Sequence, residues 1–228
     1  MRGRWRLAVP LTVLVTMHLV TLVGGFLAPN SAFEQNRGLA WAPPTRLRFV
    51  DAEGRFHLRP FVYPQVADPA ELGAYHEDRG NPSALRFFAR GDEYQLAGLF
   101  PTDLHFLGVD GPARLFFLGT DGVGRDVFAR TLVGGRASLF AGLLAATLAL
   151  GIGTVLGGLA GYLGGKTDAV LMRIVELFLA LPWLYLLLAV RAFLPLKLPP
   201  LTAFLLLVAV VGLIGWAIPA RLVRGVVL

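Results

Sequence analysis

The fold is decided by residues 118–166, which read LGTDGVGRDVFARTLVGGRASLFAGLLAATLALGIGTVLGGLAGYLGGK. This stretch begins as a polar turn and becomes an apolar run over residues 138–163. About 20 apolar residues let a helix cross the hydrocarbon core of a bilayer, so the run predicts a membrane-spanning helix. Gly153, Gly157 and Gly161 recur within it at every fourth residue, a spacing that lets a neighbouring helix backbone approach closely. We therefore expect this helix to pack against partner helices.

The composition indicates that most of the chain is built in the same way. Apolar residues make up 55% of it and charged residues 16%, whereas soluble domains have roughly 45–50% and about 25%. Three more apolar runs of near-spanning length lie at residues 7–27, 169–189 and 201–218. The sequence predicts a polytopic all-α membrane protein with an anchor helix in residues 1–27 and later helices at about 138–163, 169–190 and 201–218.

The net charge of +6 does not indicate a nucleic-acid-binding protein. Residues 28–137 carry twelve Arg and thirteen Asp or Glu, so the basic excess lies mainly beside the apolar runs. Membrane topology and anionic lipid headgroups account for such an excess, and no basic patch interleaved with aromatic residues is present. The absence of cysteine excludes disulfides, Cys-ligated zinc, iron–sulfur clusters and thiol catalysis.

The N-terminal segment has two interpretations. Arg2, Arg4 and Arg6 precede its apolar run, as basic residues do in a cleavable signal peptide. The run is about 21 residues long, however, and the apolar core of a signal peptide has about 7–15. We expect a retained anchor with a cytoplasmic N-terminus, which places the polar region that follows outside the cytoplasm.

That polar region, residues 28–117, predicts a small β-rich insert between the first two helices. Alternating residues around Asp51 and Gly54 indicate a β-hairpin, and further short strands are expected at 84–90, 94–100, 103–109 and 113–119. His57, His76 and His105 fall within the insert, but their spacing matches no metal site. We interpret these three residues as surface or strand-face histidines.

The third and fourth predicted helices contain residues that are expected to start, kink or end them. Asp168 is expected to cap the third helix, and Pro182 is expected to kink it. The fourth is expected to end near Pro219, before Arg221 and Arg224. In the expected topology, most basic residues that flank the helices lie on the same side of the membrane as the N-terminus. The positive-inside rule therefore places both ends of the chain in the cytoplasm.

Two features could carry chemistry. Residues 160–167, AGYLGGKT, differ by one residue from a phosphate-binding loop, but a membrane helix stands where such a loop needs a strand. We interpret Lys166 as part of a short turn. Glu176 lies about 12 Å into the third helix at 1.5 Å per residue, where it either lines a substrate pathway or pairs with Arg173. No hydrolase motif is present, so we expect no enzyme and no catalytic residue.

The stretch LGTDGVGRDVFARTLVGGRASL resembles the permease subunits of bacterial dipeptide and oligopeptide ABC importers, specifically the second, or C-type, of the two paired permeases. That family typically reads LGTD-x-x-GRD-x-x-SR-x-x-x-GAR-x-SL here, followed by a glycine-rich helix, a GYxGG turn, a D-x-x-x-MR segment and an LAFP-like kink. The motif residues ahead of the helix are Gly119, Thr120, Asp121, Gly124, Arg125, Asp126 and Arg136. The resemblance continues through 161–165, Asp168, 172–173, 179–182 and 220–225.

The resemblance implies a type I ABC importer transmembrane fold that moves peptides or related small solutes across the bacterial inner membrane. It also implies a second permease subunit, two ATPase subunits that bind the ATP, a periplasmic solute-binding protein, and no cofactor on this chain. Ala129 and Leu181 depart from the family's usual Ser and Phe, and the insert is longer than usual.

The family continues beyond the residue that corresponds to Leu228, first with a coupling loop that docks on the ATPase. We therefore expect residues 118–228 to form an incomplete transmembrane domain, truncated at the C-terminus, with Arg221 and Arg224 just before the missing loop. The rival hypothesis is a non-transporting, membrane-anchored protein whose external insert binds a partner.

Overall fold

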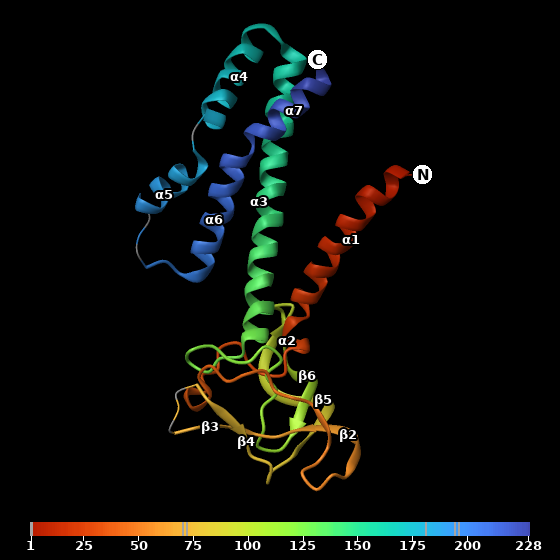
Figure 1. Cartoon of the computed structure of the whole chain (residues 1–228). Helices are drawn as coiled ribbons and strands as arrows, with labels where there is room; N and C mark the ends of the chain where they lie inside the picture. Colours follow the sequence, from red (N-terminus) through yellow and green to blue (C-terminus); the bar gives the residue numbers. More distant parts are fainter. Residues whose placement is uncertain (1, 70, 72, 181, 194, 196) are drawn as a thin grey trace. The chain divides into compact units, whose positions relative to one another are not determined.

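The computed structural model describes residues 2–69, 71, 73–180, 182–193, 195 and 197–228. The chain divides into two compact units, Met1–Ala137 and Ser138–Leu228. Helix α3 (Val127–Leu163) contributes to both, and the two units are described in turn (Figure 1).

Unit 1 begins with α1 (Arg2–Leu22) and the single turn α2 (Gly24–Leu27). The helix over residues 7–27 is thus interrupted at Val23, and α2 packs beside the sheet. The chain then passes through a long loop that contains the short 3-10 helix η1 (Arg37–Leu39).

The sheet of unit 1 has four antiparallel strands in the order β1-β2-β5-β6. The hairpin expected around Asp51 is formed by β1 (Arg48–Val50) and β2 (Phe56–Val62). A second hairpin joins β5 (Ser83–Leu96) to β6 (Phe100–Asp110), so the strands expected at 84–90 and 94–100 are largely one long strand. A separate hairpin of β3 (Gln65–Ala67) and β4 (Tyr75–Glu77) has no counterpart in the sequence prediction.

The prediction of a strand at residues 113–119 is wrong. Leu115 and Phe116 are buried there, each 1% exposed, which explains the strand-like apolar pattern. This segment does not pair with any strand of the described residues. The backbone of Phe116 forms its hydrogen bonds with Thr45 instead. The Thr45 amide donates to the Phe116 carbonyl at 2.8 Å, and the Phe116 amide donates to the Thr45 hydroxyl at 3.0 Å. An alternating apolar pattern indicates that side chains are buried, and a segment can be buried without pairing with a neighbouring strand.

In its described residues, unit 2 contains the rest of α3 and four further helices. These are α4 (Gly165–Ala180), α5 (Trp183–Phe193), α6 (Pro200–Gly215) and α7 (Ala217–Val227). The single kinked helix expected at 169–190 is therefore two helices separated at Pro182, beside residue 181, which lies outside the described residues.

The last helix also differs from the prediction of 201–218. It breaks at Trp216 and resumes as α7, which runs past Pro219 to Val227. Proline is tolerated in the first turn of a helix, where its missing N–H is not needed. Pro219 is the third residue of α7, so it lies in the opening turn and does not end the helix.

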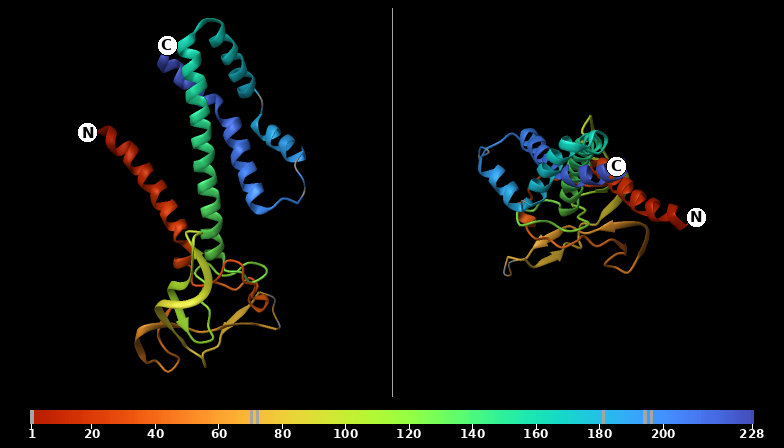
Figure 2. Two further views of the ribbon diagram at one scale, coloured as in Figure 1. Left: turned by 180° about the vertical axis from the view of Figure 1, so that it is seen from behind. Right: turned by 90° about the horizontal axis from the view of Figure 1, so that it is seen from above.

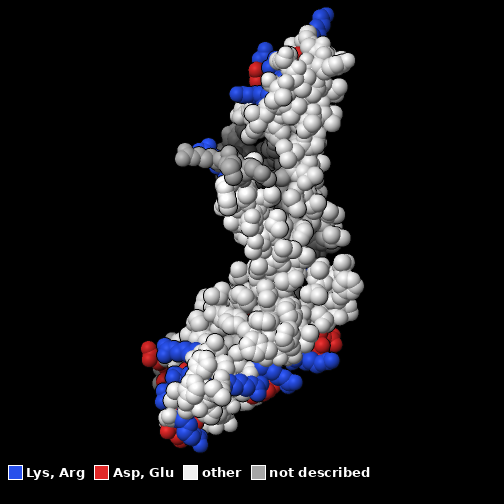
Figure 3. All heavy atoms as spheres, turned by 90° about the vertical axis from the view of Figure 1, so that its right-hand side faces the viewer, with Lys and Arg blue, Asp and Glu red and all other residues white. Residues whose placement is uncertain are grey.

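Three helical segments are long and apolar enough to cross a membrane among the described residues, namely Trp5–Leu22, Val127–Leu163 and Pro200–Val227. The expected third span is not one of them, because its two halves have only 16 and 11 residues. The chain is thus a polytopic membrane protein that is about half helical, with some sheet. On the face in Figure 3, the charged side chains of unit 1 lie over its sheet, and the helices of unit 2 are mostly uncharged.

Candidate functional site

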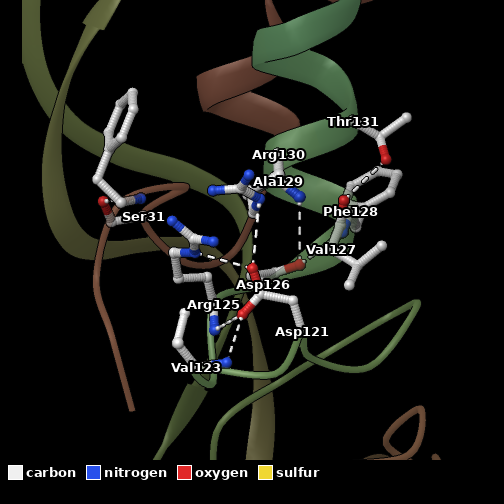
Figure 4. A network of polar contacts seen from close by, with 11 residues as sticks. Ser31, Asp121, Val123, Arg125, Asp126, Val127, Phe128, Ala129, Arg130 and Thr131 are labelled. Carbon is white, nitrogen blue, oxygen red and sulfur yellow. Dashed lines mark hydrogen bonds and ion pairs between the residues drawn. The ribbon is translucent and has the colours of Figure 1, made fainter. Parts of the chain in front are cut away.

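The motif ahead of α3 folds into a compact turn, which we call the Asp121 turn (residues 119–126). An isolated β-bridge joins Thr120 to Asp126. Inside it, the Asp121 amide donates to the Arg125 carbonyl at 3.0 Å, and the Gly124 amide donates to the Asp121 carbonyl at 2.9 Å. The turn is therefore closed by its own backbone before α3 begins (Figure 4).

The carboxylate of Asp121 organises this turn. Its Oδ1 accepts hydrogen bonds from the amides of Val123 and Arg125, both at 3.0 Å. Its Oδ2 accepts one from Nε of Arg125 at 2.8 Å and lies 3.5 Å from Nε of Arg130 in the first turns of α3 (Figure 4). Desolvation alone would raise the pKa of Asp121, but the hydrogen bonds from Arg125 and Val123 outweigh it and lower the pKa to about 2.

Asp126 caps the N-terminus of α3. Its Oδ1 accepts hydrogen bonds from the amides of Phe128 at 2.8 Å and Ala129 at 3.1 Å, and its Oδ2 accepts one from Nδ2 of Asn30 at 2.8 Å. The residue is 1% exposed, and burial raises its pKa against the opposing effect of these hydrogen bonds. The cap explains why α3 starts at Val127, eleven residues before the expected 138.

The loop that precedes the sheet packs directly on the Asp121 turn. The Ala42 amide donates to the Thr120 hydroxyl at 2.8 Å, and the Thr120 amide donates to the Ala42 carbonyl at 3.0 Å. Gly119 and Gly124 have φ of +75° and +78°. A Cβ at residue 124 would overlap the carbonyl oxygen of Asn36, and one at residue 119 would overlap that of Ala42. Glycine is needed at both positions for backbone conformation and for space.

The same turn occurs a second time in unit 1. Residues 51–55 read DAEGR where residues 121–125 read DGVGR. Oδ1 of Asp51 accepts from the amides of Glu53 and Arg55 at 3.0 and 2.8 Å, and Oδ2 accepts from Nε of Arg55 at 2.9 Å. Gly54 has φ of +80°. The repeated pattern D-x-x-G-R was present in the sequence and was missed, and it marks a self-contained turn.

Arg136 lies six residues after Arg130 in α3, which is between one and two helical turns. It lines a cavity of about 270 Å³ in unit 1 together with Tyr94 and His105. His105 is 3% exposed, so it is a buried histidine of a strand and not a surface one. Its Nδ1 lies 2.6 Å from the Ala28 carbonyl oxygen and its Nε2 lies 2.9 Å from that of Asp92. No cluster of metal-binding side chains occurs among the described residues.

In unit 2, Gly153, Gly157 and Gly161 of α3 face α7. A Cβ at residue 157 would overlap the Ala220 carbonyl. One at residue 153 would lie 2.6 Å from Cβ of Pro219, and one at residue 161 would lie 2.8 Å from Cβ of Val227. The neighbouring Gly158 has open space at its Cβ position. The sequence predicted a close-packed face without identifying its partner, which is α7.

An ion pair between Asp168 and Arg224 joins α4 to α7. Asp168 lies inside the first turn of α4 and does not cap it, contrary to the prediction. Its carboxylate accepts two hydrogen bonds from the guanidinium of Arg224 in α7. Both side chains are largely covered, with 18% and 30% exposed. Arg221, one turn earlier in α7, is exposed.

The remaining candidates lie on the surface of unit 2. Arg173 pairs with Glu176 at 3.3 Å, and both side chains are exposed in the isolated chain. Pro182 separates α4 from α5. Lys166 lies in the first turn of α4, and a single residue, Gly164 with φ of +61°, separates α4 from α3. The described residues around Lys166 therefore form two helices, whereas a phosphate-binding loop needs a strand followed by a loop.

Comparison with known proteins identifies similar chains, although no family model matches. The dipeptide transport system permease protein DppC of Bacillus subtilis is 44% identical over 128 residues, which cover 56% of this chain and 35% of that protein. The oligopeptide transport system permease protein OppC of Haemophilus influenzae is 40% identical over 147 residues, covering 63% and 42%. The peptidoglycan transport system permease protein YejE of Agrobacterium fabrum is 40% identical over 202 residues, covering 84% and 46%.

The chain spans less than half of the length of these curated relatives. All three are named as transport permeases, which are not enzymes, and this agrees with the lack of a catalytic motif. Dipeptide and oligopeptide importers recur among the names of the relatives. The resemblance first drawn from residues 118–139 is therefore supported by these relatives. The chain is similar to the permease subunits DppC and OppC of dipeptide and oligopeptide transport systems over 56% and 63% of its length.

Proposed function

We propose that this chain is a membrane-spanning permease subunit of an ABC importer that moves peptides or related small solutes across the cytoplasmic membrane. The observation that carries the proposal is the 40% identity to a transport permease over 84% of the chain. The three long apolar helices support it, because a permease has to form its path from membrane helices. The rival hypothesis of a non-transporting anchored protein has no such support among the relatives.

The proposal includes partners. Transport of this class is powered by two ATPase subunits, which bind the ATP, so the chain itself would bind no cofactor. A second permease subunit would complete the path, and a periplasmic solute-binding protein would deliver the cargo. Membrane lipid surrounds the helices, and no nucleic acid takes part.

We also propose an orientation. The N-terminus would lie in the cytoplasm and residues 28–137 outside it, because Arg2, Arg4 and Arg6 precede the first span and Lys166, Arg221 and Arg224 lie at the corresponding ends of later helices. In this orientation the sheet of unit 1 lies on the side where a solute-binding protein would arrive.

The residues of unit 2 would then serve packing and movement. Gly153, Gly157 and Gly161 would hold α7 close to α3, and the Asp168–Arg224 pair would fix α7 to α4. Arg173 and Glu176 would act as an exposed ion pair that meets a neighbouring subunit or the path. Pro182 would allow α4 and α5 to adopt different directions.

The test uses the protein in its native membrane. The chain is tagged at its own locus, membranes are solubilised in a mild detergent, and the proteins that co-purify are identified. An ATPase of the ABC type and a second permease are expected. In parallel, uptake of radiolabelled dipeptides and oligopeptides is measured in a deletion strain and in the same strain with the gene restored. Unchanged peptide uptake on deletion, together with purification free of any ATPase, would refute the proposal.

A further inference from the structure

The tip of the β5–β6 hairpin is an uncharged and largely apolar surface. Residues 94–102 read YQLAGLFPT, and the nearest charges in sequence are Glu93 and Asp103. Leu99 is 74% exposed and Phe100 is 65% exposed. Two large apolar side chains are therefore adjacent and exposed at the end of this hairpin, and the position of the tip in the fold decides what they meet.

The depth of this tip follows from its contact with α3. A Cβ at Gly98 would lie 3.7 Å from the guanidinium of Arg136, so the tip lies beside the tenth residue of the helix. Helix α3 has 37 residues, which is about 55 Å at 1.5 Å per residue and exceeds the roughly 30 Å of a hydrocarbon core. Part of it must therefore lie outside the hydrocarbon.

The charges of α3 identify that part. Arg130 and Arg136 lie within its first ten residues, and no charged residue follows before Lys166. Among the described residues, no acidic side chain forms an ion pair with Arg136. An arginine at the end of an uncharged helical run typically reaches the phosphate level of the bilayer. The hydrocarbon boundary thus falls close to Arg136, and hence close to the hairpin tip.

The first helix gives the same level independently. Its apolar span ends at Leu22, and a Cβ at Gly135 of α3 would lie 3.0 Å from Cγ2 of Thr21. The Phe26 ring, just past that end, lies 5.9 Å from the ring of Phe106 in β6. Figure 2 shows the yellow-green end of the hairpin beside the adjoining ends of α1 and α3 within unit 1.

We propose that the β5–β6 hairpin tip is an interfacial membrane anchor, in which Leu99 and Phe100 insert into the lipid leaflet that faces unit 1 and Arg136 binds a lipid phosphate. Lipid is the occupant that fits, because the surface is continuous with two membrane spans that end at the same level. Aromatic and aliphatic side chains favour this boundary region. The proposal does not depend on which solute the chain transports.

Spin labels on single cysteines measure the depth of the tip directly. The chain has no cysteine, so Leu99→Cys and Phe100→Cys each introduce one labelling site. Glu53→Cys is the matched control, because Glu53 lies exposed in the turn of the other hairpin of the same sheet. Leu144→Cys, on an exposed part of α3, gives the value for a lipid-facing site. The labelled proteins are reconstituted in vesicles of phosphatidylethanolamine and phosphatidylglycerol.

The measured quantity is the ratio of collisions with oxygen, which concentrates in lipid, to collisions with a water-soluble nickel chelate. Labels at residues 99 and 100 are expected to show a ratio several-fold higher than the label at residue 53, approaching that at residue 144. A ratio equal to that at residue 53 would mean that the tip lies in water, and would overturn the proposal. Protection from both reagents would mean that protein covers the tip, and would overturn it as well.

Discussion

Replacing Gly124 and Gly54 separately by alanine tests how the Asp121 turn is built. The two glycines take the same place in the two D-x-x-G-R turns, with φ of +78° and +80°. They differ in their surroundings. A Cβ at residue 124 would overlap the carbonyl oxygen of Asn36, whereas a Cβ at residue 54 would meet open space. Gly54→Ala therefore measures backbone strain alone, and Gly124→Ala measures strain plus overlap.

The expected magnitudes follow from these two terms. A non-glycine residue in the left-handed conformation costs about 1–2 kcal/mol, which both variants lose. Forcing extra volume into a packed site costs about 1–3 kcal/mol more, which only Gly124→Ala loses because backbone stands in the way. We expect a loss of about 1–2 kcal/mol for Gly54→Ala and about 2–5 kcal/mol for Gly124→Ala.

Thermal unfolding of the purified protein in detergent, followed by circular dichroism, gives the first comparison. Limited proteolysis gives the second, because displacement of Asn36 should expose the loop of residues 28–45 in Gly124→Ala and leave it protected in Gly54→Ala. Equal losses of stability and equal protection of the loop would refute the reasoning, since they would show that the loop does not press on residue 124.

Three further predictions concern other contacts. Gly157→Ala should lower the midpoint of thermal unfolding because the new Cβ meets the backbone of α7, whereas Gly158→Ala, which meets open space, should be neutral or gain up to about 1 kcal/mol of helix propensity. Asp121→Asn should destabilise the protein at pH 5 and above, and this difference should shrink as the pH falls toward the native pKa of about 2. A carboxyl whose pKa is lowered by folding contributes its full stabilisation above its unfolded pKa and loses it as the pH falls through its folded pKa. Asp168→Ala and Arg224→Ala should each destabilise unit 2, and the double variant should lose less than their sum by about 0.5–3 kcal/mol in chemical denaturation.

The sequence was informative where a structure depends on local composition. Length and hydropathy predicted apolar helices at 7–27, 138–163 and 201–218, and the structure has helices over these residues. The last helical segment, however, is broken at Trp216 and continues to Val227, and α3 has an early start. That start coincides with the cap at Asp126, whose carboxylate also accepts a hydrogen bond from Asn30, 96 residues away in sequence. The sequence shows a potential cap at Asp126, but periodicity counts apolar residues, and the first turns of α3 carry polar ones.

Tertiary partners were beyond such reasoning. The spacing of Gly153 and Gly157 indicated a close-packed face, but only the folded chain shows that α7 covers it and leaves Gly158 open. Similarly, Asp168 had the sequence context of a helix cap, and its bond to Arg224 depends on a contact between α4 and α7. Local rules assign a residue its propensity, and a distant partner can reassign its role.

The two D-x-x-G-R turns also show the difference between what the local sequence determines and what distant partners determine. The Asp, Gly and Arg that the two turns share make the same hydrogen bonds around Asp51 and Asp121, so the turn geometry is local. Only the second turn is followed by a buried cap, covered by a loop and joined to a membrane helix through Arg130. Its charged groups are engaged in holding those three parts together. We infer that substitutions at Asp121 act on the position of α3, so they should change the stability of the protein before they change any transport in which it takes part.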